Sequence, residues 1–124
     1  MHKAAEHHLP VLYLAVVFAA FMLYLNVASA APRAETPVEC GMAADMAVVA
    51  RSLAQEQIQR QKADAIMLKI YDVSQSDRGK QLMQEITDAA YSKPDGTSQN
   101  FAQELFAACM KTGGNMDTIL GRRL

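Results

Sequence analysis

The chain has 124 residues, a formal net charge of −1 at pH 7 and 51% hydrophobic residues. This length suits one small domain, and the balanced charge argues against a partner that is nucleic acid or an anionic membrane surface. The basic pair Arg122-Arg123 lies at the extreme C-terminus, where cations near a helix end are usually solvated. We therefore expect no nucleic-acid partner.

Residues 1–30 have the layout of an export signal. An uncharged apolar run from Leu9 to Leu25 follows a short polar head. Ala28 and Ala30 then supply the small residues that a signal peptidase requires, so we expect cleavage after Ala30, with Ala31 as the first residue of the mature chain. The head itself contains Lys3, Glu6 and the histidines His2, His7 and His8.

The apolar run also allows a second interpretation, a retained membrane anchor. About 17 apolar residues approach the roughly 20 that span a bilayer. Pro10 and Asn26 shorten the usable apolar core, and the small-residue site favours cleavage. Both alternatives place the rest of the chain outside the cytoplasm. A cleaved chain would be periplasmic or secreted, and an uncleaved chain would be anchored in the inner membrane with its domain facing the periplasm.

All three histidines lie in the segment that we expect to be removed. Without histidine, the mature chain lacks the usual base of Ser-His-Asp and Cys-His catalysis and the commonest zinc ligand. The sequence contains no glycine-rich phosphate loop and no G-x-S-x-G motif. We therefore expect a protein that is not an enzyme and has no catalytic residues, metal site or cofactor.

The two cysteines, Cys40 and Cys109, both remain after cleavage. In an oxidising compartment a lone pair is most simply a disulfide, with two free thiols or an intermolecular link as the alternatives. The bond would close a loop of about 70 residues and contribute about 4 kcal/mol by the chain-entropy estimate. The pair lacks C-x-x-C spacing, which argues against a redox site.

Residues 31–36 are predicted to be a flexible leader because they are polar and show no periodicity. A single helical domain is then predicted over 37–124. Its first helix has a capping-box start, with Thr36 at the N-cap, Pro37 at the first helical position and Glu39 three residues after the cap.

Two apolar stripes with three- and four-residue spacing follow this start, and they belong either to one long helix or to two helices joined near Gln57–Gln59. Two helices are favoured, because a helix of more than 30 residues is atypical of a small domain. The first stripe is Met42, Met46, Val49, Ala50 and Leu53, and the second is Ile58, Ala63, Ile66, Met67 and Ile70.

A third and a fourth helix are predicted from their boundaries. Ser74 with Asp77 has cap-plus-acid spacing, the third helix ends near Ser92, and Lys93–Gly96 forms a turn. Thr97 or Ser98 caps the fourth helix, Gly113-Gly114 ends it, and a short helical turn runs from Met116 to Leu120, before Gly121. The inward positions are Leu82, Met83, Ile86, Ala89 and Ala90 in the third helix and Phe101, Leu105, Phe106 and Cys109 in the fourth.

No segment shows the two-residue alternation of a strand, so the fold class is predicted to be all-α. We expect a small four-helix bundle with a short C-terminal helical turn, preceded by a signal peptide helix. The disulfide would tie the start of the first helix to the last turn of the fourth, which places these two helices side by side.

Three patterns in the sequence resemble binding sites. Met42 and Met46 lie one helical turn apart and could bind Cu(I) through thioethers, although core packing explains them more simply. Tyr71 and Tyr91 could mark a ligand mouth, but tyrosines at helix ends more often cover the core with the hydroxyl in water. A calcium loop starting at Asp72 fails because Asp77 replaces its glycine and Met83 its glutamate.

The segments CGMAADMAVVARSLA, KADAIMLKIYDV and FAQELFAACMKTGG, with the signal peptide, resemble small exported helical proteins of Gram-negative bacteria. The resemblance implies a periplasmic helical domain with one disulfide and no recognised active site. In general plan the chain is also similar to small periplasmic acid-stress chaperones, although its cysteines lie farther apart and no functional residue transfers.

The expected function is a non-enzymatic periplasmic module that binds another protein or an envelope component through a helical face. The alternatives are an acid- or stress-activated chaperone and a Cu(I)-binding protein that uses methionines.

Intact-mass analysis of the protein from its native host tests the export prediction. We expect a mass that begins at Ala31 and is two hydrogens lower than that of the dithiol, with neither Cys40 nor Cys109 alkylated until a reductant is added. A retained leader, or thiols that react without reductant, would contradict it.

Overall fold

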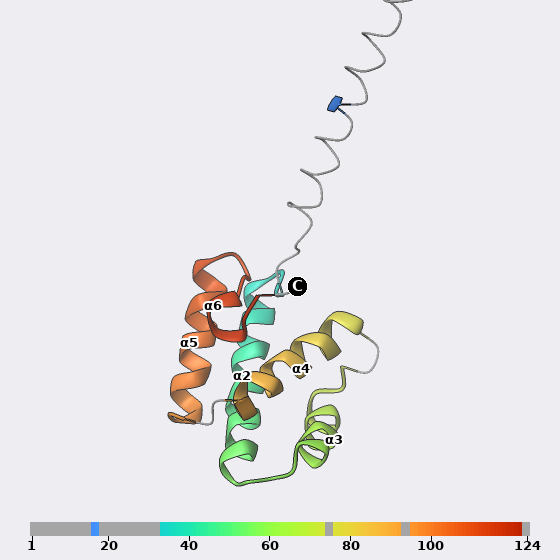
Figure 1. Ribbon diagram of the computed structural model, residues 1–124, viewed down its shortest axis with the longest axis vertical. Helices are drawn as coiled ribbons and strands as arrows, with labels where there is room; N and C mark the ends of the chain where they lie inside the picture. The colour runs from blue at the N-terminus through green and yellow to red at the C-terminus, as the bar shows by residue number, and fades with distance from the viewer. Residues whose placement is uncertain (1–15, 18–32, 74–75, 93–94, 123–124) are drawn as a thin grey trace, which may run out of the picture. The chain divides into compact units, whose positions relative to one another are not determined.

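The computed structural model describes residues 16–17, 33–73, 76–92 and 95–122, and the helical domain lies in the compact unit Pro32–Leu124. Its described residues form helices and no strands, which confirms the all-α bundle with a short C-terminal helical turn (Figure 1). The helices are α2 (Pro37–Gln55), α3 (Arg60–Tyr71), α4 (Asp77–Ser92), α5 (Ser98–Lys111) and α6 (Asp117–Leu120).

The predicted cleavage residues Ala28, Ala30 and Ala31 lie outside the described residues, and of the predicted signal peptide only Val16 and Val17 are described, as helix. Over the part of the chain that is described, no helix is both long and apolar enough to cross a membrane.

Helix α2 begins where the sequence predicts. The Thr36 hydroxyl accepts a hydrogen bond from the N–H of Glu39 at 3.2 Å, and Pro37 occupies the first turn, where its missing N–H costs no helical bond. The Glu39 carboxylate accepts the N–H of Glu35 instead of that of Thr36. The second hydrogen bond of the capping box is therefore made by the N–H of the residue before the N-cap.

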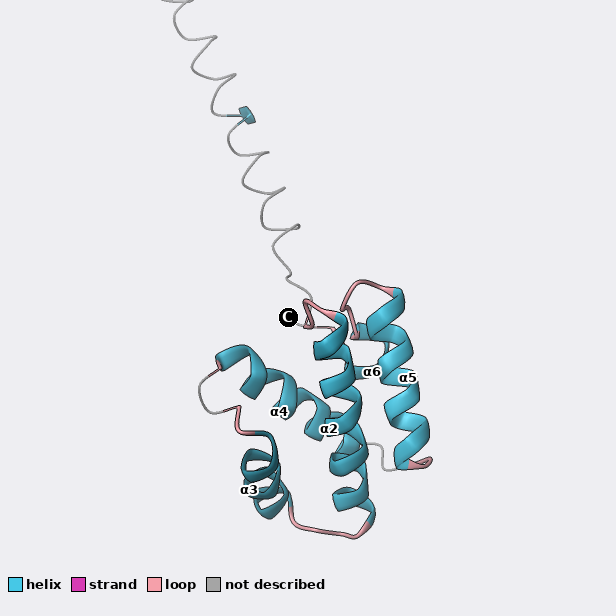
Figure 2. Ribbon diagram, turned by 180° about the vertical axis from the view of Figure 1, so that it is seen from behind, coloured by secondary structure: helices cyan, strands magenta, loops and turns pink. Residues whose placement is uncertain are grey.

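Helices α2 and α5 pack side by side and antiparallel, fixed at both ends (Figure 2). At one end the predicted disulfide joins Cys40 to Cys109 with 5.7 Å between their Cα atoms, and both residues are buried. At the other end the Arg51 guanidinium donates to the carbonyl oxygen of Asp95, just before α5, at 2.6 Å. The expectation that the first and fourth helices lie side by side is confirmed.

The two apolar stripes belong to two helices, as favoured. Helix α2 ends at Gln55, and Gln57 takes a left-handed backbone conformation with φ of 61° before α3 starts at Arg60. This conformation reverses the chain direction within a few residues. Helix α3 therefore folds back beside α2 rather than continuing it.

Three side chains expected in the core are instead exposed: Met42 at 42%, Ile70 at 53% and Phe106 at 42%. The buried face of α2 is centred on Ala43, Ala47 and neighbouring small residues, because α4 and α5 pack closely there. Val49, Leu53, Ile58, Ile66 and Ala89, also expected inward, are only partly buried. The remaining inward predictions are buried: Met46, Ala50, Ala63, Met67, Leu82, Met83, Ile86, Ala90, Phe101, Leu105 and Cys109.

The starts of α4 and α5 use hydroxyl caps. The Ser76 hydroxyl accepts the N–H of Gly79 at 3.0 Å, so it supplies the capping interaction predicted for Ser74, which lies outside the described residues. At α5 the Thr97 hydroxyl accepts the N–H of Asn100 at 3.0 Å, which selects Thr97 over Ser98 as the cap. Gly114, with φ of 94°, follows the end of α5 as predicted.

The predicted flexible leader is wrong at Arg33 and Ala34, which are 5% and 1% exposed. The Arg33 guanidinium pairs with the carboxylate of Glu85 on α4 and, at 2.5 Å, with that of Asp117 on α6, and it donates to the carbonyl of Gly121 at 2.6 Å. A polar, non-periodic segment is thus held in the domain by partners far away in the sequence.

Replacing Arg33 by alanine is expected to destabilise the domain by about 2 kcal/mol, because two carboxylates lose a charged hydrogen-bond donor but can partly regain water. Urea unfolding at pH 7 measures this loss. The control is Lys62→Ala on the exposed surface of α3, which should change the free energy of unfolding by less than about 0.5 kcal/mol. Equal effects of the two variants would contradict a supporting role for Arg33.

Candidate functional site: an apolar recess beside α2

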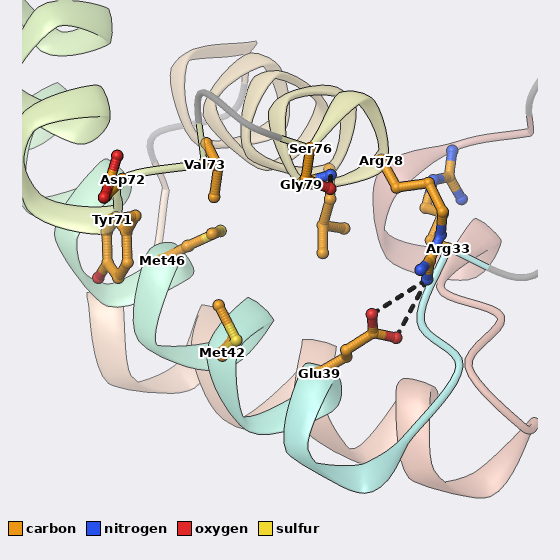
Figure 3. Close-up of a pocket in the computed structure, with 11 residues that line it drawn as sticks. Arg33, Glu39, Met42, Met46, Tyr71, Asp72, Val73, Ser76, Arg78 and Gly79 are labelled. Carbon is orange, nitrogen blue, oxygen red and sulfur yellow. Dashed lines mark hydrogen bonds and ion pairs between the residues drawn. The ribbon is translucent and has the colours of Figure 1, made fainter.

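A recess of about 260 Å³ opens between α2, the end of α3 and the start of α4 (Figure 3). Two stretches of the chain form it, one before and within α2 and the other from the end of α3 into α4. Its lining residues are Arg33, Glu39, Met42, Met46, Tyr71, Asp72, Val73, Ser76, Arg78, Gly79 and Leu82.

The inner wall of the recess is apolar. Met42 and Met46 project from successive turns of α2, and Val73 faces them from the connection between α3 and α4 (Figure 3). Met46 is 1% exposed, whereas Met42 is 42% exposed and lies at the opening. A Cβ atom at Gly79 would lie 3.1 Å from the Val73 side chain, so glycine lets α4 approach this wall closely.

The ends of the recess are polar. At one end the Tyr71 hydroxyl donates to a carboxylate oxygen of Asp45 at 2.8 Å. Burial, and then the neighbouring Asp45 carboxylate, raise the pKa of Tyr71 above its usual value, which keeps the phenol neutral at physiological pH. Tyr71 therefore lines the recess, while Tyr91, the other candidate mouth residue, instead donates its hydroxyl to the carbonyl of Ile58.

At the other end an ion-pair cluster joins α4 to the start of α2. Arg78 donates to both carboxylate oxygens of Glu39 at 3.1 Å (Figure 3). It also lies 3.4 Å from the carboxylate of Glu35. The N–H of Glu35 first, and Arg78 in addition, lower the pKa of Glu39, against the opposing effect of partial burial. The cluster closes this end of the recess.

The size of the recess limits what it can hold. Pockets for cofactors and drug-sized ligands usually enclose about 300–1,000 Å³. At about 260 Å³, open on one side, this recess suits one large apolar side chain better than a whole cofactor.

The described residues contain no group of three His, Cys, Asp or Glu side chains that could hold an ion. Met42 and Met46, the residues of the Cu(I) hypothesis, do line the same recess, but only Met42 is substantially exposed.

A second cavity, of about 350 Å³, lies beside Arg51 and the start of α5. The Arg51 guanidinium stacks over the Phe101 ring at 4.2 Å, and its buried Nε has no hydrogen-bond partner among the described residues. Burial lowers the pKa of Arg51. Through its hydrogen bond to the Asp95 carbonyl, this arginine holds the α4–α5 connection.

Sequence reasoning singled out Met42, Met46 and Tyr71 but did not place them together. It missed Arg33, Glu39 and Arg78 as site residues, since nothing local distinguishes them from solvated charges. No protein family, curated protein or solved structure matched this chain. The interpretation of the recess therefore depends on its own geometry and chemistry.

Because the pKa of Glu39 is lowered from 4.5 in the folded state, its contribution to stability is present above about pH 4.5 and is lost as the pH falls through the lowered pKa. Glu39→Gln should be less stable than the wild type at pH 7 and should lose less stability between pH 7 and pH 3. Urea unfolding across this range measures both effects.

Glu56→Gln, a change at an exposed acid directly after α2, is the matched control and should keep the wild-type pH dependence. If the free energy of unfolding of the Glu39→Gln variant changed with pH as that of the wild type does, the ionised Glu39 carboxylate would not stabilise the fold.

Proposed function

We propose that this protein is an exported, non-enzymatic binding module that accepts an apolar side chain of a partner protein in the recess. The observation that carries the proposal is the solvent-open apolar wall, in which half-exposed Met42 lies over buried Met46. Methionine is unbranched and polarisable, so it adapts to different apolar side chains.

The scaffold around the recess supports a binding role because its walls are held before a partner arrives. The Cys40–Cys109 disulfide fixes the start of α2, and Arg33 attaches the segment before α2 to α4 and α6. A preformed surface loses less conformational entropy on binding. The disulfide is also the feature expected of an oxidising compartment such as the periplasm.

The chemistry of the recess supports binding rather than catalysis. Its wall offers thioethers and aliphatic groups, its tyrosine is held neutral, and Arg78 is engaged by two carboxylates. Catalytic sites usually need a nucleophile, acid or base whose pKa is tuned toward neutral pH. The pKa of Tyr71 moves away from neutrality, and so does that of Glu39.

A photo-crosslinking amino acid at position 42 in the native host tests this function. We expect a discrete adduct with one partner protein, because position 42 lies at the opening of the recess. The matched control is position 110, since Met110 on α5 is 46% exposed and does not line the recess. The adduct should be absent there, and it should disappear when a second change, Leu82→Asn, makes the recess wall polar.

Equal adducts from both positions, or none from position 42, would contradict the proposal. Urea unfolding of the Leu82→Asn variant shows whether this variant is still folded at the assay temperature. If it is folded, the missing adduct reports a change in the recess and not unfolding of the domain.

A further inference from the structure

The charges around the recess indicate the chemistry of its partner. We infer, on the basis of the proposed function, that the partner inserts an aliphatic side chain, of leucine or methionine size, which is flanked by lysine or arginine. The inference joins two observations: the apolar wall sized for one side chain, and an excess of carboxylates around its opening.

The carboxylates come from three elements. Glu39 on α2 and Asp72 after α3 line the recess. Asp45 on α2 accepts the hydroxyl of the lining residue Tyr71, and Glu35 lies beside the lining residue Arg78. Asp45, Asp72 and Glu35 are exposed, so a partner can reach them.

The two lining cations are already engaged. Arg33 is 5% exposed and is paired with Glu85 and Asp117, which places it behind the wall rather than at the surface. Arg78 is half-exposed but is shared between Glu35 and Glu39. The charge of Arg33 is compensated by Glu85 and Asp117, behind the wall. The four carboxylates named above then face the one guanidinium of Arg78, so the net charge around the opening is negative and favours a basic partner.

The apolar wall adds a requirement that charge alone does not impose. Val73 and Leu82 are buried at its base, and Met42 covers its opening. Inserting a leucine removes apolar surface from water on both partners, whereas a serine of the same peptide would not. The site should therefore distinguish peptides of equal charge by one side chain.

Three fluorescent peptides test the inference with the oxidised protein purified from its native host. They have the same length and differ at the centre or the flanks: Lys-Lys-Leu-Lys-Lys, Lys-Lys-Ser-Lys-Lys and Glu-Glu-Leu-Glu-Glu, each between Gly-Ser ends. Fluorescence anisotropy measures Kd at 50 and 300 mM salt. We expect the basic leucine peptide to bind about tenfold more tightly than the serine peptide and to weaken as salt is raised.

Two double variants test whether the carboxylates at the recess cause the binding of the basic leucine peptide. Asp45→Asn/Asp72→Asn keeps side-chain shape and should weaken the basic leucine peptide about fivefold. Glu56→Gln/Glu104→Gln removes the same formal charge from exposed acids that do not line the recess, and it should change Kd less than twofold. Met42→Gln should reduce the preference for leucine over serine, because the opening becomes polar while the inner wall stays apolar.

Three results would overturn the inference: tighter binding of the acidic peptide, equal binding of the leucine and serine peptides, or equal effects of the two double variants. The failure of all three peptides while the position-42 adduct persists would overturn the partner chemistry but leave the proposed function in place. Loss of that adduct would instead remove the function itself.

Discussion

The packing of α2 against α5 is the constraint on which the rest of the domain depends. The Cys40–Cys109 disulfide fixes one end of the pair, and the Arg51–Asp95 hydrogen bond fixes the other. Between these ends the contact face of α2 consists largely of alanines with no exposed surface, which allows a close approach. The covalent link also restricts the unfolded chain, and this restriction matters for a domain with a small core.

The recess exists because the neighbouring helices cover only part of the surface of α2. Helices α4 and α5 cover its alanine face, and the adjoining turns that carry Met42 and Met46 face the end of α3, Val73 and the start of α4, which leave the recess open. Arg33, buried behind the wall, joins the segment before α2 to α4 and α6 through its ion pairs.

Features with local causes were predictable from the sequence. The Thr36 cap, the break near Gln57 and the cysteine pair were all identified, because a cap or a turn depends on a few adjacent residues and a lone cysteine pair has few alternatives. The helical stripes were less reliable. Phe106 satisfied the apolar spacing but is 42% exposed, since periodicity identifies an apolar face without showing which part of it a neighbouring helix covers.

The fold class, the start of α2 and the disulfide partners could be read from the sequence, because they depend on short-range backbone preferences and on there being only two cysteines. The tertiary structure alone shows that Arg33 is buried with partners 52 and 84 residues away, and that Met42, Tyr71 and Arg78 border one recess. Ion pairs and cavities form between segments whose separation in sequence carries no pattern, so they exist only once the helices have packed.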